Sequence, residues 1–413
     1  MKSNLLFLVH RLPFPPNKGD KVRSYHLLKH LCQQHHVFLG TFVDDPKDEV
    51  HVETVRALCA DLHVARLRPP LARLSSLAGL LTGQSLSVRY YHDSGMQRWV
   101  NDTLVGQQID TIIIFSSVMA QYAQPESGIN QPPMVVDFVD VDSAKWTQYA
   151  GAHRWPMSWI YRREGALLQK FERDVASRAK KSFFVTENET ALFQKIAPEC
   201  TGSVIAMSNG VDTGYFSPDP LLITPFDGPG VASDQISLVF TGAMDYWPNI
   251  DAVTWFVRQI LPVLRQTRPQ IRFYIVGRNP PPSVLALAGN AVVVTGTVND
   301  VRPYLQHATL VVAPLRVARG LQNKILEAMA MGKPVVASRS CALGLDATQD
   351  ELVSASGVRG FVHEILALLA SPTRAVSIGE AARRRVIRNY SWSAHLSGID
   401  CYLNVPSSKR EHL

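Results

Sequence analysis

The sequence predicts an α/β protein that contains two Rossmann-like domains. Short apolar runs typical of buried parallel strands alternate along the chain with longer amphipathic stretches typical of helices. The length of 413 residues suits two domains of ordinary size. Hydrophobic residues make up 46% of the chain and charged residues 19%, so the chain has enough apolar surface to form packed cores and does not resemble a disordered protein.

The first half of the chain contains seven apolar runs that we expect to form strands. They lie at residues 4–9, 36–42, 62–65, 111–115, 134–139, 182–186 and 204–207. The first of these runs is interrupted by His10 and Arg11, which predicts a buried strand rather than a signal peptide. The clearest helices between the strands are expected at residues 24–33 and 162–178, where apolar residues recur at helical spacing.

The second half of the chain repeats the same alternation. Strands are expected at residues 237–241, 272–276, 292–295, 310–313, 334–337 and 352–354. A helix is expected at residues 249–265, and the Pro- and Gly-rich residues 215–234 are typical of a connection between domains. The prediction is therefore a domain at residues 1–208, a second domain at residues 209–388, and a C-terminal helix and tail at residues 389–413.

Charge and cysteine usage narrow the class of protein. The net charge is +7 and the pI is near 9.1, which favours anionic partners but is a modest excess for a nucleic-acid binder. The five cysteines are widely spaced and form no C-x-x-C pair, so neither a disulfide framework nor a zinc site is expected, and the reduced cytoplasm is the predicted compartment. No apolar stretch approaches the ~18 residues of a membrane span, so we expect any membrane contact to be peripheral.

Residues 313–337 hold the most informative pattern of the chain. A buried strand is followed by a loop, and a helix opens near Gln322 and ends before Gly332. Lys324 then lies in the first turn of this helix, where free N–H groups and the positive end of the helix dipole favour a phosphate. Glu327 lies about one turn later on the same face, and its carboxylate can accept two hydrogen bonds from a diol such as a ribose. The alternative is a surface Lys–Glu pair, but the glycines that frame this helix favour a binding site.

Two further segments, together with residues 313–337, carry a resemblance to a known family. They read Ser-Asn-Gly-Val-Asp at residues 208–212 and Thr-Gly-Ala-Met-Asp-Tyr-Trp-Pro-Asn at residues 241–249. Together the three segments resemble glycosyltransferase family 4, whose members are retaining, nucleotide-sugar-dependent enzymes of the GT-B fold. Residues 15–24, 136–143 and 155–163 resemble, more closely, the branch associated with exopolysaccharide production in bacteria that have the PEP-CTERM/exosortase system.

The resemblance implies an architecture and an activity. It implies two Rossmann-like domains that face each other across a cleft, with the C-terminal helix returning to the N-terminal acceptor domain. It implies a metal-independent transferase of the hexosyltransferase type, without a cofactor, that moves a sugar from a nucleotide diphosphate sugar to a lipid-linked glycan acceptor. The place implied is the cytoplasm, with peripheral contact at the anionic inner face of the plasma membrane.

One position departs from the family pattern. Family 4 enzymes commonly carry two glutamates eight positions apart, but Arg319 stands where the first would be and only Glu327 matches. Arg319 offers a planar fork that suits a carboxylate or a phosphate. The residues that we expect to bind the donor are Gly19, Gly242, Arg319, Gly320, Asn323, Lys324 and Glu327.

Three aspartates follow the strand expected at residues 134–139. Asp140 and Asp142 have the spacing of a D-x-D metal motif, but a basic phosphate site needs no metal, so no metal ligand is predicted. Asp137 or Asp140, together with Glu327, are the catalytic candidates, and a base or a hydroxyl-orienting group is the expected role of the aspartates. The alternative for Asp142 or Ser143 is a helix N-cap.

The loop after the first strand supplies the remaining candidates. Gly19 would allow the backbone to approach a phosphate closely, and Lys21 adds positive charge beside it; a simple turn with solvated cations is the alternative. The acceptor-side candidates are Lys18, Asp20, Arg23 and Asp142. His10 is the one histidine flagged as a residue that could line the cleft, although a structural role is the more common one for a lone histidine.

Two alternatives to a transferase stay open, namely a nucleotide-sugar epimerase of the same fold and a non-catalytic binder of nucleotide sugars or glycans. The stretch at residues 154–163 mixes arginine with tryptophan and tyrosine, which suits a membrane surface or a lipid acceptor. Its alternative is that Trp155, Trp159 and Ile160 are core residues of the helix that follows.

Overall fold

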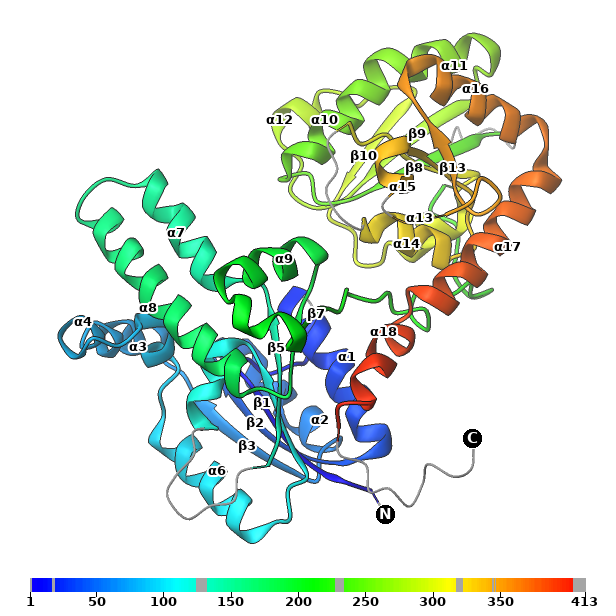
Figure 1. The fold of residues 1–413 in the computed structure, drawn as a ribbon. Helices are drawn as coiled ribbons and strands as arrows, with labels where there is room; N and C mark the ends of the chain where they lie inside the picture. Colours follow the sequence, from blue (N-terminus) through cyan, green and yellow to red (C-terminus); the bar gives the residue numbers. More distant parts are fainter. Residues whose placement is uncertain are drawn as a thin grey trace. The chain divides into compact units, whose positions relative to one another are not determined.

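The structure is a computed structural model that describes residues 2–16, 19–123, 132–226, 234–316, 322–343, 345 and 347–403 (Figure 1). The chain divides into two compact units. Unit 1 comprises Met1–Asn209 together with His395–Leu413, and unit 2 comprises Gly210–Ala394.

Unit 1 is built on a seven-stranded sheet in which all the paired strands run parallel. Its strands are β1 (Asn4–Val9), β2 (His36–Val43), β3 (Asp61–Arg66), β4 (Thr111–Phe115), β5 (Met134–Val139), β6 (Lys181–Phe184) and β7 (Val204–Ala206). Their order is β3-β2-β1-β4-β5-β6-β7. The predicted strands are therefore confirmed to within two residues, because continuous runs of buried β-branched and aromatic residues mark strands covered on both faces.

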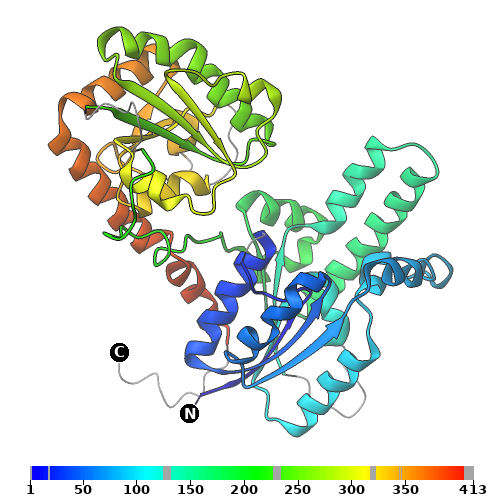
Figure 2. The ribbon, with the colours of Figure 1, turned by 180° about the vertical axis from the view of Figure 1, so that it is seen from behind.

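The helices of unit 1 include a pair, α7 and α8, that packs as a hairpin. The α-helices before the C-terminal segment are α1 (Gly19–Gln34), α2 (Val52–Arg56), α3 (Pro69–Ser76), α4 (Gly79–Thr82), α5 (Leu86–Tyr90), α6 (Ser94–Gly106), α7 (Asp142–Ala152), α8 (Met157–Arg178) and α9 (Glu187–Ile196). Short 3₁₀ helices lie at Pro46–His51, Ser117–Tyr122 and Pro198–Ser203. Helices α7 and α8 form an antiparallel hairpin that extends from unit 1, with α3 and α4 beside α8 in both views (Figures 1 and 2).

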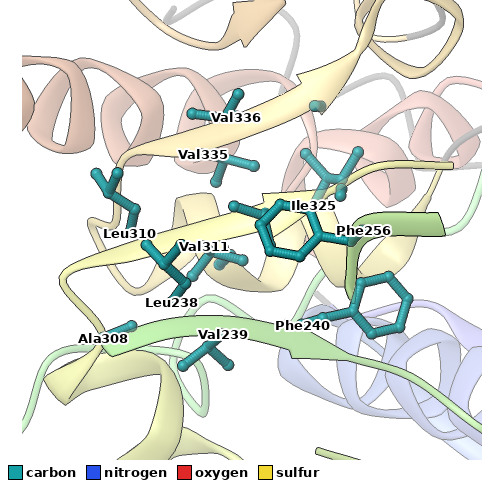
Figure 3. Packing of buried hydrophobic residues seen from close by; sticks show 14 of the residues in the cluster. Leu238, Val239, Phe240, Phe256, Ala308, Leu310, Val311, Ile325, Val335 and Val336 are labelled. Carbon is teal, nitrogen blue, oxygen red and sulfur yellow. The ribbon is translucent and has the colours of Figure 1, made fainter. Parts of the chain in front are cut away.

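Unit 2 contains a second parallel sheet with six strands, in the order β10-β9-β8-β11-β12-β13. The strands are β8 (Ile236–Thr241), β9 (Ile271–Val276), β10 (Val292–Gly296), β11 (Leu310–Ala313), β12 (Val335–Ser338) and β13 (Val353–Ala355). Figure 3 shows how the apolar side chains of β8, β11 and β12 pack with Ile325 and Phe256. This core fixes the position of the helix that carries Ile325.

One predicted helix of unit 2 differs from the helix that the structure shows. The helices of unit 2 are α10 (Trp247–Trp255), α11 (Leu261–Thr267), α12 (Pro282–Leu285), α13 (Arg302–His307), α14 (Asn323–Ala330), α15 (Arg339–Leu343), α16 (Gly357–Ala370) and α17 (Pro372–Asn389). The helix predicted at residues 249–265 is interrupted by a π-helical turn at Phe256–Ile260. Pro262 follows this turn and has no N–H to donate to the preceding turn, so the regular α-helical ladder cannot continue through it.

The chain passes between the units twice. Gly210 packs so closely on Trp392 that a Cβ there would lie 2.6 Å from its backbone nitrogen. Helix α18 (Trp392–Asp400) follows, and within unit 1 its Asp400 lies 2.8 Å from His30 Nε2. Among the described residues no single helix is long and apolar enough to cross a membrane, although α16 and α17, bent by 106° to each other, pass the length and composition test as a pair.

Candidate functional site

The order of the strands locates a candidate site at the carboxyl edge of the unit 2 sheet. Strand order reverses between β8 and β11, and ligands of open parallel sheets bind beyond the carboxyl ends of strands at such a switch point. Strand β8 ends at Thr241 and is followed by Gly242, while β11 leads through a loop into α14. The most informative motif of the sequence therefore lies at the switch point.

Lys324 occupies the first turn of α14, as the sequence predicts. Its Nζ donates a hydrogen bond to Asn249 Oδ1 and lies 4.7 Å from the centre of the buried Phe240 ring. Within the described part of the chain Lys324 forms no salt bridge, although it is largely enclosed. Burial lowers the pKa of this ammonium to about 8. Among the described residues, therefore, no carboxylate lies within salt-bridge distance of this cation.

Asn249 and Gly242 shape the space around this cation. Asn249 donates from Nδ2 to the carbonyl of Ala243 at 2.8 Å, which orients its oxygen toward Lys324. A Cβ on Gly242 would lie 2.8 Å from Asn249 Nδ2 and 3.1 Å from Lys324 Nζ, so only glycine leaves room for both side chains. Asn249 ends the quoted segment 241–249 but was not among the predicted site residues, because its role depends on a contact 75 residues away.

Glu327 lies one turn after Lys324 and is half-buried. Burial raises the pKa of its carboxyl to about 7, while the positive charge of Lys324 opposes this rise. No side-chain hydrogen bond to Glu327 is present among the described residues, so its oxygens are available to a ligand. Asn323, at the start of α14, is exposed. Arg319 and Gly320 lie outside the described residues, and their predicted roles stay predictions.

Unit 1 has its own switch point, between β1 and β4. His10 follows β1; its ring stacks on Phe115 at the end of β4, with centroids 5.9 Å apart, and meets the edge of Tyr91. His10 Nε2 lies 3.4 Å from Asp20 in the first turn of α1. Polar and aromatic groups from distant segments thus meet at this edge; the sequence named His10 and Asp20 as candidates here, but not Tyr91 or Phe115.

Arg11 joins two carboxylates in this cluster. It donates to Asp20 at 3.0 Å and to Asp44, which follows β2, at 2.8 Å. Burial alone would raise the pKa of Asp20, but the bonds to His10 and Arg11 hold it well below its usual range. We name His10, Arg11, Asp20 and Asp44 the unit 1 cluster. Only Asp20 was among the predicted acceptor-side residues, and Lys18 lies outside the described residues.

The prediction for the loop after β1 is wrong in one respect. Gly19 is the first residue of α1 rather than part of a loop, so Lys21 and Arg23 lie within the helix and face the interior. Lys21 donates to Asp48 at 2.7 Å. Arg23 forms two hydrogen bonds with Asp137, at 2.7 and 3.2 Å. Neither cation presents its charge to an incoming ligand.

The same pairing argues against Asp137 as a general base. Asp137 and Arg23 are both almost completely buried, and Arg23 also donates to Asn209 at 2.9 Å. A base must reach the proton that it removes. The geometry therefore favours a structural role for Arg23 and Asp137, which join α1 to β5 across 114 residues of sequence.

The other two aspartates share a lysine. Lys145 donates to Asp140 at 2.8 Å and to Asp142 at 3.0 Å. The alternative role of Asp142 or Ser143 as a helix N-cap is wrong, because the capping position of α7 is Val141 and Ser143 donates to Glu172 instead. No group of three or more His, Cys, Asp or Glu side chains placed to hold a metal ion occurs among the described residues.

Comparison with known proteins finds a family match for part of unit 2. Residues 235–371, a third of the chain, match the family model of the group 1 glycosyl transferases. No curated protein sequence matches the chain.

Solved structures resemble the whole chain. The structure of Anabaena HepE in complex with UDP has a TM-score of 0.61 at 16% identity and covers 98% of this chain and 99% of its own. Sucrose-phosphate synthase from Thermosynechococcus elongatus has a TM-score of 0.62 at 17% identity, over 97% of this chain and 98% of its own. WaaG, a glycosyltransferase involved in lipopolysaccharide biosynthesis, has a TM-score of 0.53 at 17% identity, over 97% and 100%. The chain therefore has the GT-B fold, and its second unit matches the group 1 glycosyl transferases.

Proposed function

We propose that this protein is a retaining glycosyltransferase that moves a sugar from a nucleotide diphosphate sugar to a glycan acceptor. The observation that carries the proposal is the pair Lys324 and Glu327 at the unit 2 switch point, one cation and one carboxylate without a salt bridge within the described residues. The matched family model covers this segment, and HepE, which has the same fold, has been crystallised with UDP and with UDP-glucose.

The donor site is proposed to act through charge. Lys324 and the first-turn N–H groups of α14 neutralise the diphosphate as the bond between the anomeric carbon and the diphosphate oxygen breaks. Glu327 accepts hydrogen bonds from the ribose hydroxyls and so fixes the position of the nucleoside in the site. The acceptor hydroxyl forms the new bond to the same face of the sugar, and its proton passes to an oxygen of the departing diphosphate.

Because the counter-charge is supplied by Lys324, we propose that the reaction needs no metal and no cofactor. Activity should persist in excess EDTA. If a chelated, inactive protein recovers activity on addition of Mn²⁺ or Mg²⁺, the metal-independent proposal is wrong and Asp140 with Asp142 becomes the first place to seek the ion.

The acceptor is proposed to bind unit 1. The carboxylates of Asp20 and Asp44 can accept hydrogen bonds from sugar hydroxyls, and His10 Nε2 lies beside Asp20 at the switch point. A cavity of about 570 Å³ adjoins the unit 1 cluster at Asp44. Its lining includes the charged residues Glu49, Arg66 and Arg68 and an apolar wall formed by Val43, Pro46, Leu67, Pro69, Pro70 and Leu71. A neutral glycan joined to a lipid would match this combination of carboxylates and apolar surface.

We propose that the acceptor is a lipid-linked glycan of bacterial exopolysaccharide biosynthesis, glycosylated in the cytoplasm at the inner face of the plasma membrane. The support is the resemblance of residues 15–24, 136–143 and 155–163 to that branch, together with the fold shared with WaaG. Family 4 membership is proposed on residues 208–212, 241–249 and 313–337.

Arg319 is proposed to select the donor. Arginine can only donate hydrogen bonds, so contact with the sugar would favour a uronic-acid donor over its neutral counterpart, and Arg319→Glu would reverse this order. Contact with the diphosphate would weaken all donors alike in the same variant. Equal affinities of wild type and variant for glucose and glucuronate donors would remove Arg319 from the site.

The deciding experiment is a panel of nucleotide diphosphate sugars, tested first for binding and then for turnover. Binding with release of nucleoside diphosphate and transfer to a glycolipid acceptor supports the proposal. Binding without turnover indicates a non-catalytic binder, and recovery of an isomerised nucleotide sugar indicates an epimerase.

A further inference from the structure

The α7–α8 hairpin exposes large aromatic side chains at its tip. Trp155, in the connection between the helices, is 80% exposed, and Trp159 in the first turn of α8 is 53% exposed. Tyr149 and Met157 are also exposed. Trp155 and Trp159 are therefore not the core residues that the alternative interpretation of the sequence expected, and Ile160 is only half-buried.

Aromatic residues other than Trp155 and Trp159 already hold the hairpin together. Tyr161 packs against Trp146, Tyr149 and His153, with ring centroids 5.3, 6.2 and 5.1 Å apart. A Cβ on Gly165 would lie 2.7 Å from Thr147 Oγ1, so the two helices are in close contact below the tip. The exposure of the tryptophans is thus not needed to join α7 to α8.

A second group of exposed apolar side chains lies on α3. Leu71 and Leu74 are 57% and 67% exposed, and Leu77, directly after the helix, is exposed as well. Large exposed apolar groups of this kind mark interaction surfaces when they gather in one place.

Two adjacent residues of α8 hold the α4–α5 segment, which follows α3, against the hairpin. Arg163 donates to the carbonyls of Gly79 at 2.7 Å and Gln84 at 3.3 Å. The buried Glu164 accepts from Ser85 Oγ at 2.6 Å and from the N–H groups that begin α5, at 2.7 and 2.9 Å. Since Trp159 and Arg163 are four residues apart on α8, the exposed tryptophan lies on the face that contacts the α4–α5 segment. Figures 1 and 2 show α3 and α4 beside α8.

The charge of both segments has one sign. Residues 62–92 and residues 143–163 contain no aspartate or glutamate. Arg68, Arg73, Arg154 and Arg162 lie in these segments, are exposed, and form no salt bridge within the described part of the chain. Aromatic rings and leucines beside unpaired arginines match the boundary between acyl chains and anionic head groups.

We propose that the tip of the α7–α8 hairpin and the exposed face of α3 form one surface that docks on an anionic lipid bilayer. The sequence pointed only to residues 154–163; the contacts of Arg163 and Glu164 hold the α4–α5 segment against α8, and α3 in turn packs on α5. Leu71 also lines the cavity beside Asp44, so docking would bring the bilayer next to the proposed acceptor site. Only the biological role of this surface rests on the proposed function, since binding to lipid needs no nucleotide-sugar donor.

The test is flotation of the full chain with vesicles of phosphatidylcholine alone or mixed with phosphatidylglycerol. Wild type should bind the anionic vesicles, more weakly as salt rises. The variants W155S/W159S and L71S/L74S should each lower the partition coefficient by about tenfold or more, and R154Q/R162Q should remove the preference for anionic vesicles. Val105→Ser is the matched control, because Val105 is 75% exposed on α6, outside both segments, and its loss should change nothing.

Other results would overturn the proposal. Absence of vesicle binding, or binding by L71S/L74S equal to wild type, would show that the joint surface does not exist. A dimer that dissociates in W155S/W159S but not in Val105→Ser would assign the tip to a second copy of the chain. Nucleotide-sugar affinity, measured on every variant, reports separately on the proposed function, because the proposed donor site lies in unit 2 and all the variants lie in unit 1.

Discussion

The two switch points of the molecule differ in how their ionised side chains are paired. In unit 1 the ionised groups near the carboxyl edge are paired with each other, as Arg11 is with Asp20 and Asp44. In unit 2 Lys324 contacts only an amide and a ring among the described residues, and Glu327 accepts no side-chain hydrogen bond there. A buried charge without a partner is costly, so a fold keeps one chiefly where a ligand will provide the partner. This contrast supports the proposal that the anionic donor binds unit 2 and a neutral acceptor binds unit 1.

The largest expected effect comes from breaking a buried pair in unit 1. Arg23→Met should lower the free energy of unfolding by about 3 to 5 kcal/mol, because it leaves the Asp137 carboxylate buried without its cation. Urea unfolding measures the loss. The double variant Arg23→Met with Asp137→Leu should recover much of it, since an apolar pair of similar volume removes both charges. A single variant as stable as wild type would contradict the structural role of the pair.

The second prediction concerns the uncompensated charges of unit 2. Lys324→Ala and Glu327→Ala should each weaken donor binding by about 1.5 to 3 kcal/mol, because each loses a charge-assisted hydrogen bond to the donor. Their stability should change little, since neither side chain forms a salt bridge within the described part of the chain. Calorimetric titration with the nucleotide sugar selected from the panel measures the affinity, and Lys145→Ala serves as the control in unit 1. Donor affinity that is unchanged in both variants would remove this site from the proposal.

These predictions also mark what a sequence can and cannot reveal. The strands were predicted closely because continuous apolar runs can be read locally, and Lys324 was placed correctly because its helix start is local too. The partner of Arg23 was missed because Asp137 is 114 residues away and only the fold brings the two together. Likewise, Asn249 became a site residue only through its bond to Lys324. Long-range pairing of polar groups leaves no periodic signal in the chain.

The third prediction is a pH dependence of donor affinity. Burial lowers the pKa of Lys324 to about 8 and raises that of Glu327 to about 7. Affinity should therefore fall below about pH 7, as Glu327 gains a proton, and above about pH 8, as Lys324 loses one. A nucleotide diphosphate sugar keeps its own charge across this range, so the change would belong to the protein. In Lys324→Arg the alkaline fall should disappear, because a guanidinium stays protonated. A flat profile in the wild type would show that the two groups do not bind the donor.

The smallest expected effect separates the exposed pairs of unit 1 from its buried one. Lys145 donates to Asp140 and Asp142, but all three side chains are about a third to a half exposed. Water and salt screen such pairs, so Lys145→Ala should change the free energy of unfolding by less than about 1 kcal/mol, against the much larger loss expected for Arg23→Met. The measurement is the same urea titration, repeated at high salt, where the small loss should shrink further. A loss as large as that of the buried pair would mean that Asp140 and Asp142 repel each other strongly without Lys145, and the division of unit 1 into buried structural and exposed weak pairs would have to be withdrawn.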